Sequence, residues 1–261
     1  MAKIITICNQ KGGTGKTTTA INLSTYLAVA NKKVLLVDID PQGNSTSGIG
    51  IDKNSLEFSI YHCLLGQNKL QEATKKTSVS NLDIVPSNVD LVGLEVELAN
   101  VENREFRLRE AIAPIREVYD YIFIDAPPSL GLLTLNGLTA ADSVLIPLQC
   151  EYYALEGLSQ LLKSIELVKQ ALNPYLVIEG VLLTMADYRT NLTQEIIREA
   201  REFFKDKVFQ TIIPRNVRLS EAPSFGKPVL FYDKNSLGAK MYESLAKEFL
   251  GQNLSQLIEN K

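Results

Sequence analysis

Short apolar, β-branched runs alternate along the chain with longer stretches in which apolar residues recur at helical spacing. The apolar positions in the short runs are nearly continuous, which is typical of parallel strands covered on both faces. These runs predict strands at residues 4–8, 34–37, 82–85, 121–124, 143–148 and 177–183. The helical patterns predict helices at residues 18–30, 104–118, 155–172 and 192–204.

The alternation of these elements predicts an α/β fold, with a doubly wound, mostly parallel sheet and helices on both faces. Such sheets bind ligands at the carboxyl ends of their strands, so we expect chemistry in the loops after Cys8, Val37 and Ile124. The chain has 261 residues and 45% hydrophobic residues, without an internal repeat or a linker. We therefore expect a single domain over residues 1–261.

A glycine-rich loop joins the first predicted strand to the first predicted helix. Its sequence is Lys11-Gly12-Gly13-Thr14-Gly15-Lys16-Thr17. Glycines let several backbone N–H groups face one anion, and the helix N-terminus adds partial positive charge. In a P-loop, the lysine reaches the β- and γ-phosphates and the next hydroxyl ligates Mg²⁺. These roles fall to Lys16 and Thr17, with Thr18 near the α-phosphate, so the sequence predicts a Mg²⁺-dependent ATPase.

Two further predicted strands end in carboxylates. Asp38 and Asp40 follow residues 34–37, and Asp125 follows residues 121–124. The second strand has the form of a Walker B strand, so we expect Asp125 to hold Mg²⁺ through water. Asp40 lies past its strand end, where a carboxylate can orient the attacking water or contact Mg²⁺ through water. We expect Asp38 either to be structural or to help hold the metal-bound water.

The loop departs from the ordinary P-loop at its first position, where Gln10 and Lys11 replace the expected glycine start. The form K-G-G-x-G-K-T resembles the deviant Walker A motif of the family that contains ParA, MinD, nitrogenase iron protein and arsenite-pump ATPases. This resemblance implies a homodimer with ATP, in which Lys11 reaches the phosphates of the partner subunit and Gly12 permits close approach. The family usually has valine at Thr14, and we expect the change to be tolerated because the backbone makes the contact.

Longer segments resemble chromosomal ParA proteins of the Soj type, over nearly the whole chain. The resemblance implies an ATP-driven sandwich dimer that binds double-stranded DNA without sequence preference. A ParB-like partner would stimulate hydrolysis and release the dimer, in chromosome or plasmid segregation. We expect slow basal turnover. The segments are residues 38–44, 126–134, 149–157, 180–185 and 213–223.

The same resemblance implies an adenine site far from the loop in sequence. A methionine sulfur and a proline ring make a flat apolar slot for a base. The residues that the resemblance places at the adenine are Met185, Pro214, Arg215 and Asn216.

Charge alone does not predict DNA binding, because the net charge of −3 argues against a dedicated basic nucleic-acid binder. The resemblance assigns Arg189 and Arg218 to DNA, and guanidinium groups pair well with phosphate oxygens. A dimer can place two copies of a basic face side by side, so overall charge is no obstacle. We expect a cytoplasmic, nucleoid-associated protein.

A membrane-cycling regulator like MinD is an alternative. Such proteins carry a C-terminal amphipathic membrane helix, and apolar residues at helical spacing continue here to Leu254, Leu257 and Ile258. Residues 239–261 contain three basic and three acidic groups without a polybasic face. We therefore expect a C-terminal helix at about 237–250 to dock on the protein body. We see no signal peptide or membrane-spanning stretch and expect no membrane contact.

The cysteines bear on a second alternative, a redox or metal carrier on the same scaffold. Iron-protein reductases need thiolates that face a dimer axis. Cys8, Cys63 and Cys150 lie far apart, form no CxxC pair and match no such motif. We interpret them as small buried hydrophobic residues of a protein in a reducing compartment.

Overall fold

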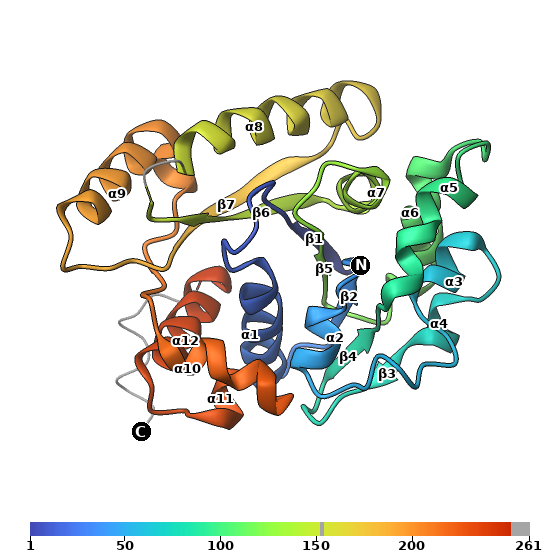
Figure 1. The fold of residues 1–261 in the computed structure, drawn as a ribbon, viewed down its shortest axis with the longest axis horizontal. Helices are drawn as coiled ribbons and strands as arrows, with labels where there is room; N and C mark the ends of the chain where they lie inside the picture. The colour runs from blue at the N-terminus through green and yellow to red at the C-terminus, as the bar shows by residue number, and fades with distance from the viewer. Residues whose placement is uncertain (152–153, 252–261) are drawn as a thin grey trace.

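The computed structural model describes residues 1–151 and 154–251, and its centre is a seven-stranded sheet (Figure 1). The strand order is β3-β4-β2-β5-β1-β6-β7, and every pair is parallel except β3–β4. The predicted fold class is confirmed. The strands are β1 Lys3–Ile7, β2 Val34–Asp38, β3 Lys75–Lys76, β4 Leu82–Val85, β5 Tyr121–Asp125, β6 Ser143–Gln149 and β7 Val177–Thr184.

Helices cover both faces of the sheet and enclose two apolar cores. Alternation along the first strand explains the arrangement, since Ile5 and Ile7 enter one core while Ile4 and Cys8 enter the other. One face carries α1 Lys16–Val29, α10 Val217–Glu221, α11 Val229–Tyr232 and α12 Leu237–Phe249 (Figure 1). The other carries α3 Ile60–Leu65, α6 Arg107–Ile112, α7 Leu132–Ala140, α8 Ala154–Ala171 and α9 Asn191–Phe204.

Most predicted elements are confirmed. Each predicted strand ends within one residue of an observed one, and the helices predicted at 18–30, 155–172 and 192–204 correspond to α1, α8 and α9. Short elements complete the connections. They are α2 Asn44–Gly48, α4 Leu70–Ala73, η1 Val89–Gly93, α5 Leu94–Glu97, η4 Lys205–Lys207 and η5 Ala222–Phe225.

The continuous helix predicted at 104–118 is wrong. The segment is divided into η2 Arg104–Phe106, α6 and η3 Ala113–Ile115. Pro114 has no backbone N–H and lies at the start of η3, so the α-helix ends at Ile112. The sequence pattern also missed α7, because its residues are buried nearly all round and show no polar face.

The last helix, α12, packs on α1. Tyr242 and Leu245 are fully buried, and the Tyr26 hydroxyl donates a 2.7 Å hydrogen bond to the carbonyl of Ala239. Leu254, Leu257 and Ile258 lie outside the described residues. Within residues 1–151 and 154–251, no helix combines the length and apolar character needed to cross a bilayer.

The three cysteines are all buried and reduced, as interpreted from the sequence. Burial raises the thiol pKa of Cys8 and Cys63 to about 12 and that of Cys150 to about 11. A thiol with such a pKa carries little reactive thiolate at neutral pH.

Candidate active site

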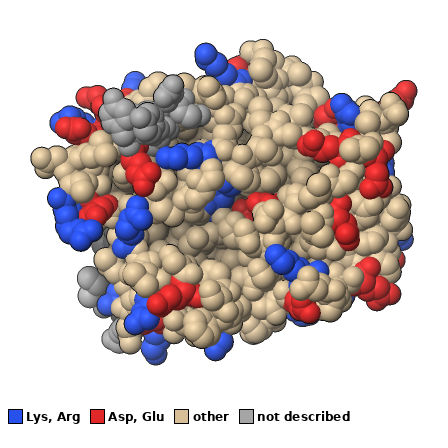
Figure 2. Space-filling view, in the orientation of Figure 1, with Lys and Arg blue, Asp and Glu red and all other residues tan. Residues whose placement is uncertain are grey.

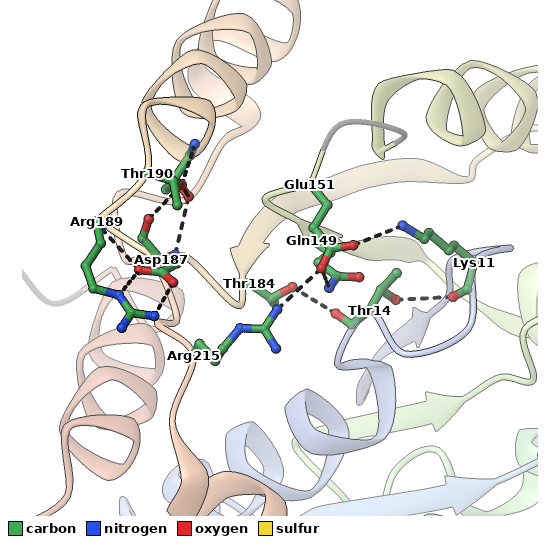
Figure 3. Close-up of polar contacts among 10 residues, drawn as sticks. Lys11, Thr14, Gln149, Glu151, Thr184, Asp187, Arg189, Thr190 and Arg215 are labelled. Atoms are coloured by element: carbon green, nitrogen blue, oxygen red, sulfur yellow. Dashed lines mark hydrogen bonds and ion pairs between the residues drawn. The ribbon is translucent and has the colours of Figure 1, made fainter.

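The glycine-rich loop connects β1 to α1 and curls at two left-handed glycines. Gly13 has φ of 74° and Gly15 has φ of 86°, a conformation that a side chain would strain. Gly15 is also the N-cap of α1, so the helix begins where the loop ends. The buried Thr184 hydroxyl donates a 2.9 Å hydrogen bond to the carbonyl of Thr14, which ties the loop to the end of β7 (Figure 3). The loop therefore presents a fixed backbone surface at the start of a helix, the arrangement that binds phosphate.

The two loop lysines lie in different surroundings. Lys16 is buried, and its Nζ donates to the carbonyl of Lys11 at 3.2 Å. Burial lowers the pKa of Lys16, although the carboxylates of Asp125 and Asp40 oppose this. The Lys11 side chain is 39% exposed and extends across the loop to Glu151, with 3.5 Å between Nζ and Oε2 (Figure 3). One lysine thus belongs to the floor of the site and the other to its rim.

Glu151 joins the rim of the loop to a distant segment. Its Oε1 accepts a 2.6 Å hydrogen bond from Gln149 and lies 3.3 Å from Nη2 of Arg215 (Figure 3). Glu151 therefore holds two cations, Lys11 and Arg215, that come from opposite ends of the chain.

Two buried aspartates end neighbouring strands, because Asp38 of β2 is in register with Asp125 of β5. Burial raises the pKa of Asp125 to about 6, opposed by the hydrogen bond from Ser45 and by the nearby Thr17 hydroxyl. Burial, followed by the charge of Asp125, raises the pKa of Asp38 to about 8. Two buried carboxylates side by side are costly unless a proton or a cation neutralises them.

The carboxylate oxygens of Asp38 and Asp125 differ in their hydrogen-bond partners. Both oxygens of Asp38 accept hydrogen bonds, Oδ1 from the Asp40 backbone and Oδ2 from the backbone and hydroxyl of Thr46. This favours the structural role for Asp38. Asp125 Oδ2 accepts from Ser45 at 2.7 Å, while its buried Oδ1 has no partner among the described residues. With the Thr17 hydroxyl beside it, this free oxygen fits a hydrated Mg²⁺ ion, which prefers oxygen ligands and retains water.

Asp40 faces the phosphate loop across a cavity of about 290 Å³. Its Oδ1 accepts a 2.9 Å hydrogen bond from the backbone of Gln42, which fixes the carboxylate at the turn before α2. The cavity is lined by the loop from Gly12 to Thr18, together with Asp40, Gln42, Asn44, Pro128 and Met185. A carboxylate is therefore held across the space where phosphates would lie.

A second cavity of about 360 Å³ continues from the first and shares residues with it. A short parallel bridge between Ala186 and Pro214 brings the segment after β7 against the segment before α10. The four residues assigned to adenine, Met185, Pro214, Arg215 and Asn216, all line this cavity. Its mostly apolar wall and its continuity with the phosphate loop suit a nucleoside.

Several residues that line this cavity were not predicted from the sequence. Thr184 ends a parallel strand, and that position was a signal for a site residue. The other missed residues come from short helices, from the segment before α10 and from α12, and no motif assigned them a role. They are Asn44, Ser47, Ile213, Leu219, Ser220, Pro223 and Tyr242.

The two arginines assigned to DNA lie outside these cavities, and both pair with carboxylates. The Arg189 guanidinium donates two hydrogen bonds to Asp187, at 2.8 and 2.6 Å, while the side chain stays 87% exposed (Figure 3). Arg218 on α10 lies 2.8 Å from Glu221. Basic side chains lie near α9 and α10, on the left of Figure 2, interspersed with acidic ones.

Comparisons with known proteins agree on one family. A family profile described as "AAA domain" matches residues 2–178. The sporulation initiation inhibitor protein Soj of Bacillus subtilis is 58% identical over 248 residues, covering 95% of this chain and 98% of that protein. The chromosome partitioning protein ParA of Myxococcus xanthus is 58% identical over 250 residues, covering 96% and 88%.

A solved structure shows the same fold. It is cobyrinic acid a,c-diamide synthase from Mycobacterium smegmatis with a bound ATP analogue and magnesium, 36% identical with a TM-score of 0.84. The match covers 96% of this chain and 95% of that one.

Proposed function

This chain belongs to the Soj/ParA family of chromosome-partitioning ATPases, and we propose that it hydrolyses ATP with Mg²⁺ as a nucleotide-dependent homodimer that binds DNA. Residues 1–261 act as one ATPase domain, with α12 docked on the body. The observation that carries the proposal is the continuous pair of cavities at the carboxyl edge of the sheet. One end is lined by phosphate-loop backbone and the other by the predicted adenine residues.

Within one subunit, the loop amides and Lys16 bind the phosphates, and the apolar cavity takes the base. Mg²⁺, held by Thr17 and through water by Asp125, neutralises charge on the phosphates during hydrolysis. Asp40 orients the attacking water from across the phosphate cavity. Thr18 adds a contact at the α-phosphate.

The division between the two lysines supports a site shared between subunits. Lys16 is already committed to its own loop, whereas the exposed Lys11 ammonium lies at the rim. A lysine at the rim can reach the phosphates of a facing copy, where it offsets the repulsion between two triphosphates. Gly12 helps here because a Cβ at that position would meet nothing within 4 Å in one subunit, so its small size leaves room for a partner.

The dimer binds double-stranded DNA through Arg189 and Arg218, and a ParB-like partner stimulates hydrolysis and releases it. Both arginines are exposed and pair with partly exposed carboxylates, Arg189 with Asp187 and Arg218 with both Glu221 and Asp233, which phosphate oxygens can replace. The protein therefore acts in the cytoplasm on the nucleoid, in chromosome or plasmid segregation. Basal turnover is slow, since the partner supplies the stimulus.

The test compares Lys11→Ala with Lys16→Ala. Lys11→Ala should bind ATP as a monomer by light scattering, without DNA binding or hydrolysis above background, because only the charge offered to the partner is lost. Lys16→Ala should lose much of its nucleotide affinity itself. Dimerisation of Lys11→Ala at the parent level would refute the shared site.

The proposed DNA binding is tested by measuring the affinity of the parent protein for DNA in three separate conditions: with ATP, with ADP and without nucleotide. We expect binding with ATP alone. A liposome flotation assay separates this function from a MinD-like membrane cycle, and flotation of the ATP form would favour the membrane cycle.

A further inference from the structure

The segment formed by η1 and α5 has two apolar faces, of which only one is covered. Leu91, Leu94 and Leu98 are buried in the core. Val89, Val92 and Val96 follow helical spacing on the outside and are 70%, 64% and 80% exposed. Single exposed valines are ordinary, but three at helical spacing form a continuous apolar stripe that is typical of a contact surface. We call these three residues the valine stripe.

Unpaired negative charge surrounds the valine stripe. Asp90, Glu95, Glu97 and Glu102 are exposed, and no described Lys or Arg lies within ion-pair distance of any of them. The hydrogen-bond donors that reach three of these carboxylates are neutral: Asn88 for Asp90, the Leu132 backbone for Glu95 and Tyr61 for Glu97. Acidic side chains gather over this part of the molecule, on the right of Figure 2.

We call these four carboxylates the acidic rim, and Arg104, the basic residue nearest to them in sequence, does not neutralise them. Arg104 lies 3.3 Å from Glu105 and donates a hydrogen bond to the carbonyl of Ala99. The valine stripe is therefore apolar at its centre and negative at its edge.

One of the rim carboxylates connects this surface to the active site. Glu95 Oε1 accepts a 2.9 Å hydrogen bond from the backbone N–H of Leu132, the first residue of α7. The loop that leads into this helix starts directly after Asp125, the proposed Mg²⁺ ligand. A Cβ at Gly131 would collide with Glu95, so the two segments are in close contact. A cation that pairs with the Glu95 carboxylate would weaken its hydrogen bond to Leu132 and so destabilise the N-terminus of α7.

We propose that the valine stripe and its acidic rim bind a cationic segment with apolar side chains from the partner that activates hydrolysis, and that Glu95 transmits binding to the loop after Asp125. This inference rests on the proposed partner-stimulated ATPase function. Apolar side chains of the segment cover the valines, and its Lys or Arg residues pair with the rim.

A second copy of this chain is a poorer occupant. A symmetric contact would place the same surface on both sides and oppose the four carboxylates to themselves. Like charges across an interface cost binding energy, whereas a cationic segment gains it.

The test uses the full chain, with the ParB-like protein encoded in the same genome as probe. The double variant Val92→Ser/Val96→Ser removes most of the valine stripe. The matched control is Val118→Ser/Val177→Ser, since these valines are 55% and 53% exposed and lie away from the carboxyl edge of the sheet. Binding to the probe and the ATPase rate with and without it are measured for each.

We expect basal ATPase to be unchanged in both double variants. In Val92→Ser/Val96→Ser the half-saturating probe concentration should rise about tenfold or more, as for loss of central contact residues. The control should match the parent. Asp90→Asn/Glu102→Gln should weaken binding and flatten its salt dependence.

Glu95 is tested as a positioning residue. In Glu95→Ala the probe should still bind, while the stimulated rate at saturating probe should fall. Glu95→Gln should not restore the stimulated rate, because its amide oxygen can still accept from Leu132 but carries no charge to pair with the partner's cation; full rescue by glutamine would assign Glu95 a structural role only.

The outcomes distinguish failure of the proposed docking surface from failure of the proposed function. If the parent is stimulated and Val92→Ser/Val96→Ser responds identically, the valine stripe is not the docking site and the proposed function stands. If Glu95→Ala is stimulated like the parent, transmission through Glu95 is wrong. If the probe neither binds nor stimulates the parent, the partner arm of the proposed function fails, and the docking surface fails with it.

Discussion

Replacing Glu151 by glutamine should strengthen nucleotide-dependent dimerisation. In the single subunit, the Lys11 ammonium lies 3.5 Å from Glu151, on the same rim that would face a partner. To reach the partner's phosphates, the lysine must leave this carboxylate. Glutamine keeps the size of the side chain and its acceptor oxygen for Gln149, but it removes the charge that holds Lys11. The variant therefore lowers the cost of release without changing the phosphate loop.

The magnitude follows from the exposure of the pair. The Lys11 side chain is 39% exposed and that of Glu151 is 44%, so solvent screens their attraction. Exposed ion pairs contribute about 0.2–1 kcal/mol each. A symmetric dimer releases two of them, or about 0.4–2 kcal/mol, which corresponds to a roughly 2- to 30-fold tighter dimer. High salt should reduce the gain, because it already weakens the pair.

Sedimentation equilibrium with a non-hydrolysable ATP analogue measures this dimer constant. The matched control is Glu179→Gln, which removes the ion pair with Lys3 on β1 and leaves the site untouched. Because Glu151 also contacts Arg215, nucleotide affinity of the monomer is measured separately and should change little. An unchanged or weaker dimer in Glu151→Gln, with normal nucleotide affinity, would refute the idea that Glu151 retains Lys11.

Three further predictions follow from the site. Asp40→Ala should bind ATP and accumulate as a dimer on DNA but barely hydrolyse it, and normal turnover would remove Asp40 from its role. Arg189→Ala and Arg218→Ala should each weaken binding to all DNA sequences and lower the log–log salt slope by about two, at ~0.9 per contact in two copies; an unchanged slope would make them ordinary surface charges. Burial raises the pKa of Asp125 to about 6 and of Asp38 to about 8, so the folded chain holds protons that the unfolded chain releases. The free energy of unfolding without nucleotide should therefore fall as pH rises from about 4 to about 8, and a higher urea midpoint at about pH 8 than at about pH 5 would contradict this.

The parts of the site that are local in sequence were predictable. The phosphate loop needs a strand, glycines and a helix start in succession, and all three lie within residues 3–29. Asp38 and Asp125 follow directly from strand ends, because parallel strands deliver their carboxyl ends to one edge. Continuous apolar runs also located the strands, since both faces of the sheet are covered.

Contacts between distant segments were not predictable from such patterns. Nothing in the sequence around Glu151 shows that it meets both Lys11 and Arg215, since the contact depends on how β6 and β7 lie beside β1. Apolar periodicity over 104–118 indicated one helix, but such a pattern is insensitive to Pro114, which lacks the backbone N–H that a continuous helix needs. The different surroundings of Asp38 and Asp125 likewise appear only once Thr46 and Ser45 are in place.

The cations proposed to act on other molecules share one feature that explains how a chain with net charge −3 can bind polyanions. Lys11 pairs with Glu151, Arg189 with Asp187 and Arg218 with Glu221, all at partly exposed positions. Such pairs contribute little to stability, so exchanging a carboxylate for a phosphate oxygen costs little. Lys16 differs because it is buried against its own loop, where we propose that it binds the nucleotide phosphates. Affinity for an outside polyanion would then depend on presenting several of these cations at once, which the proposed dimer would do and one subunit would not. If the chain dimerises with nucleotide as proposed, that step would be sufficient to couple ATP to DNA binding without a strongly basic surface on either subunit.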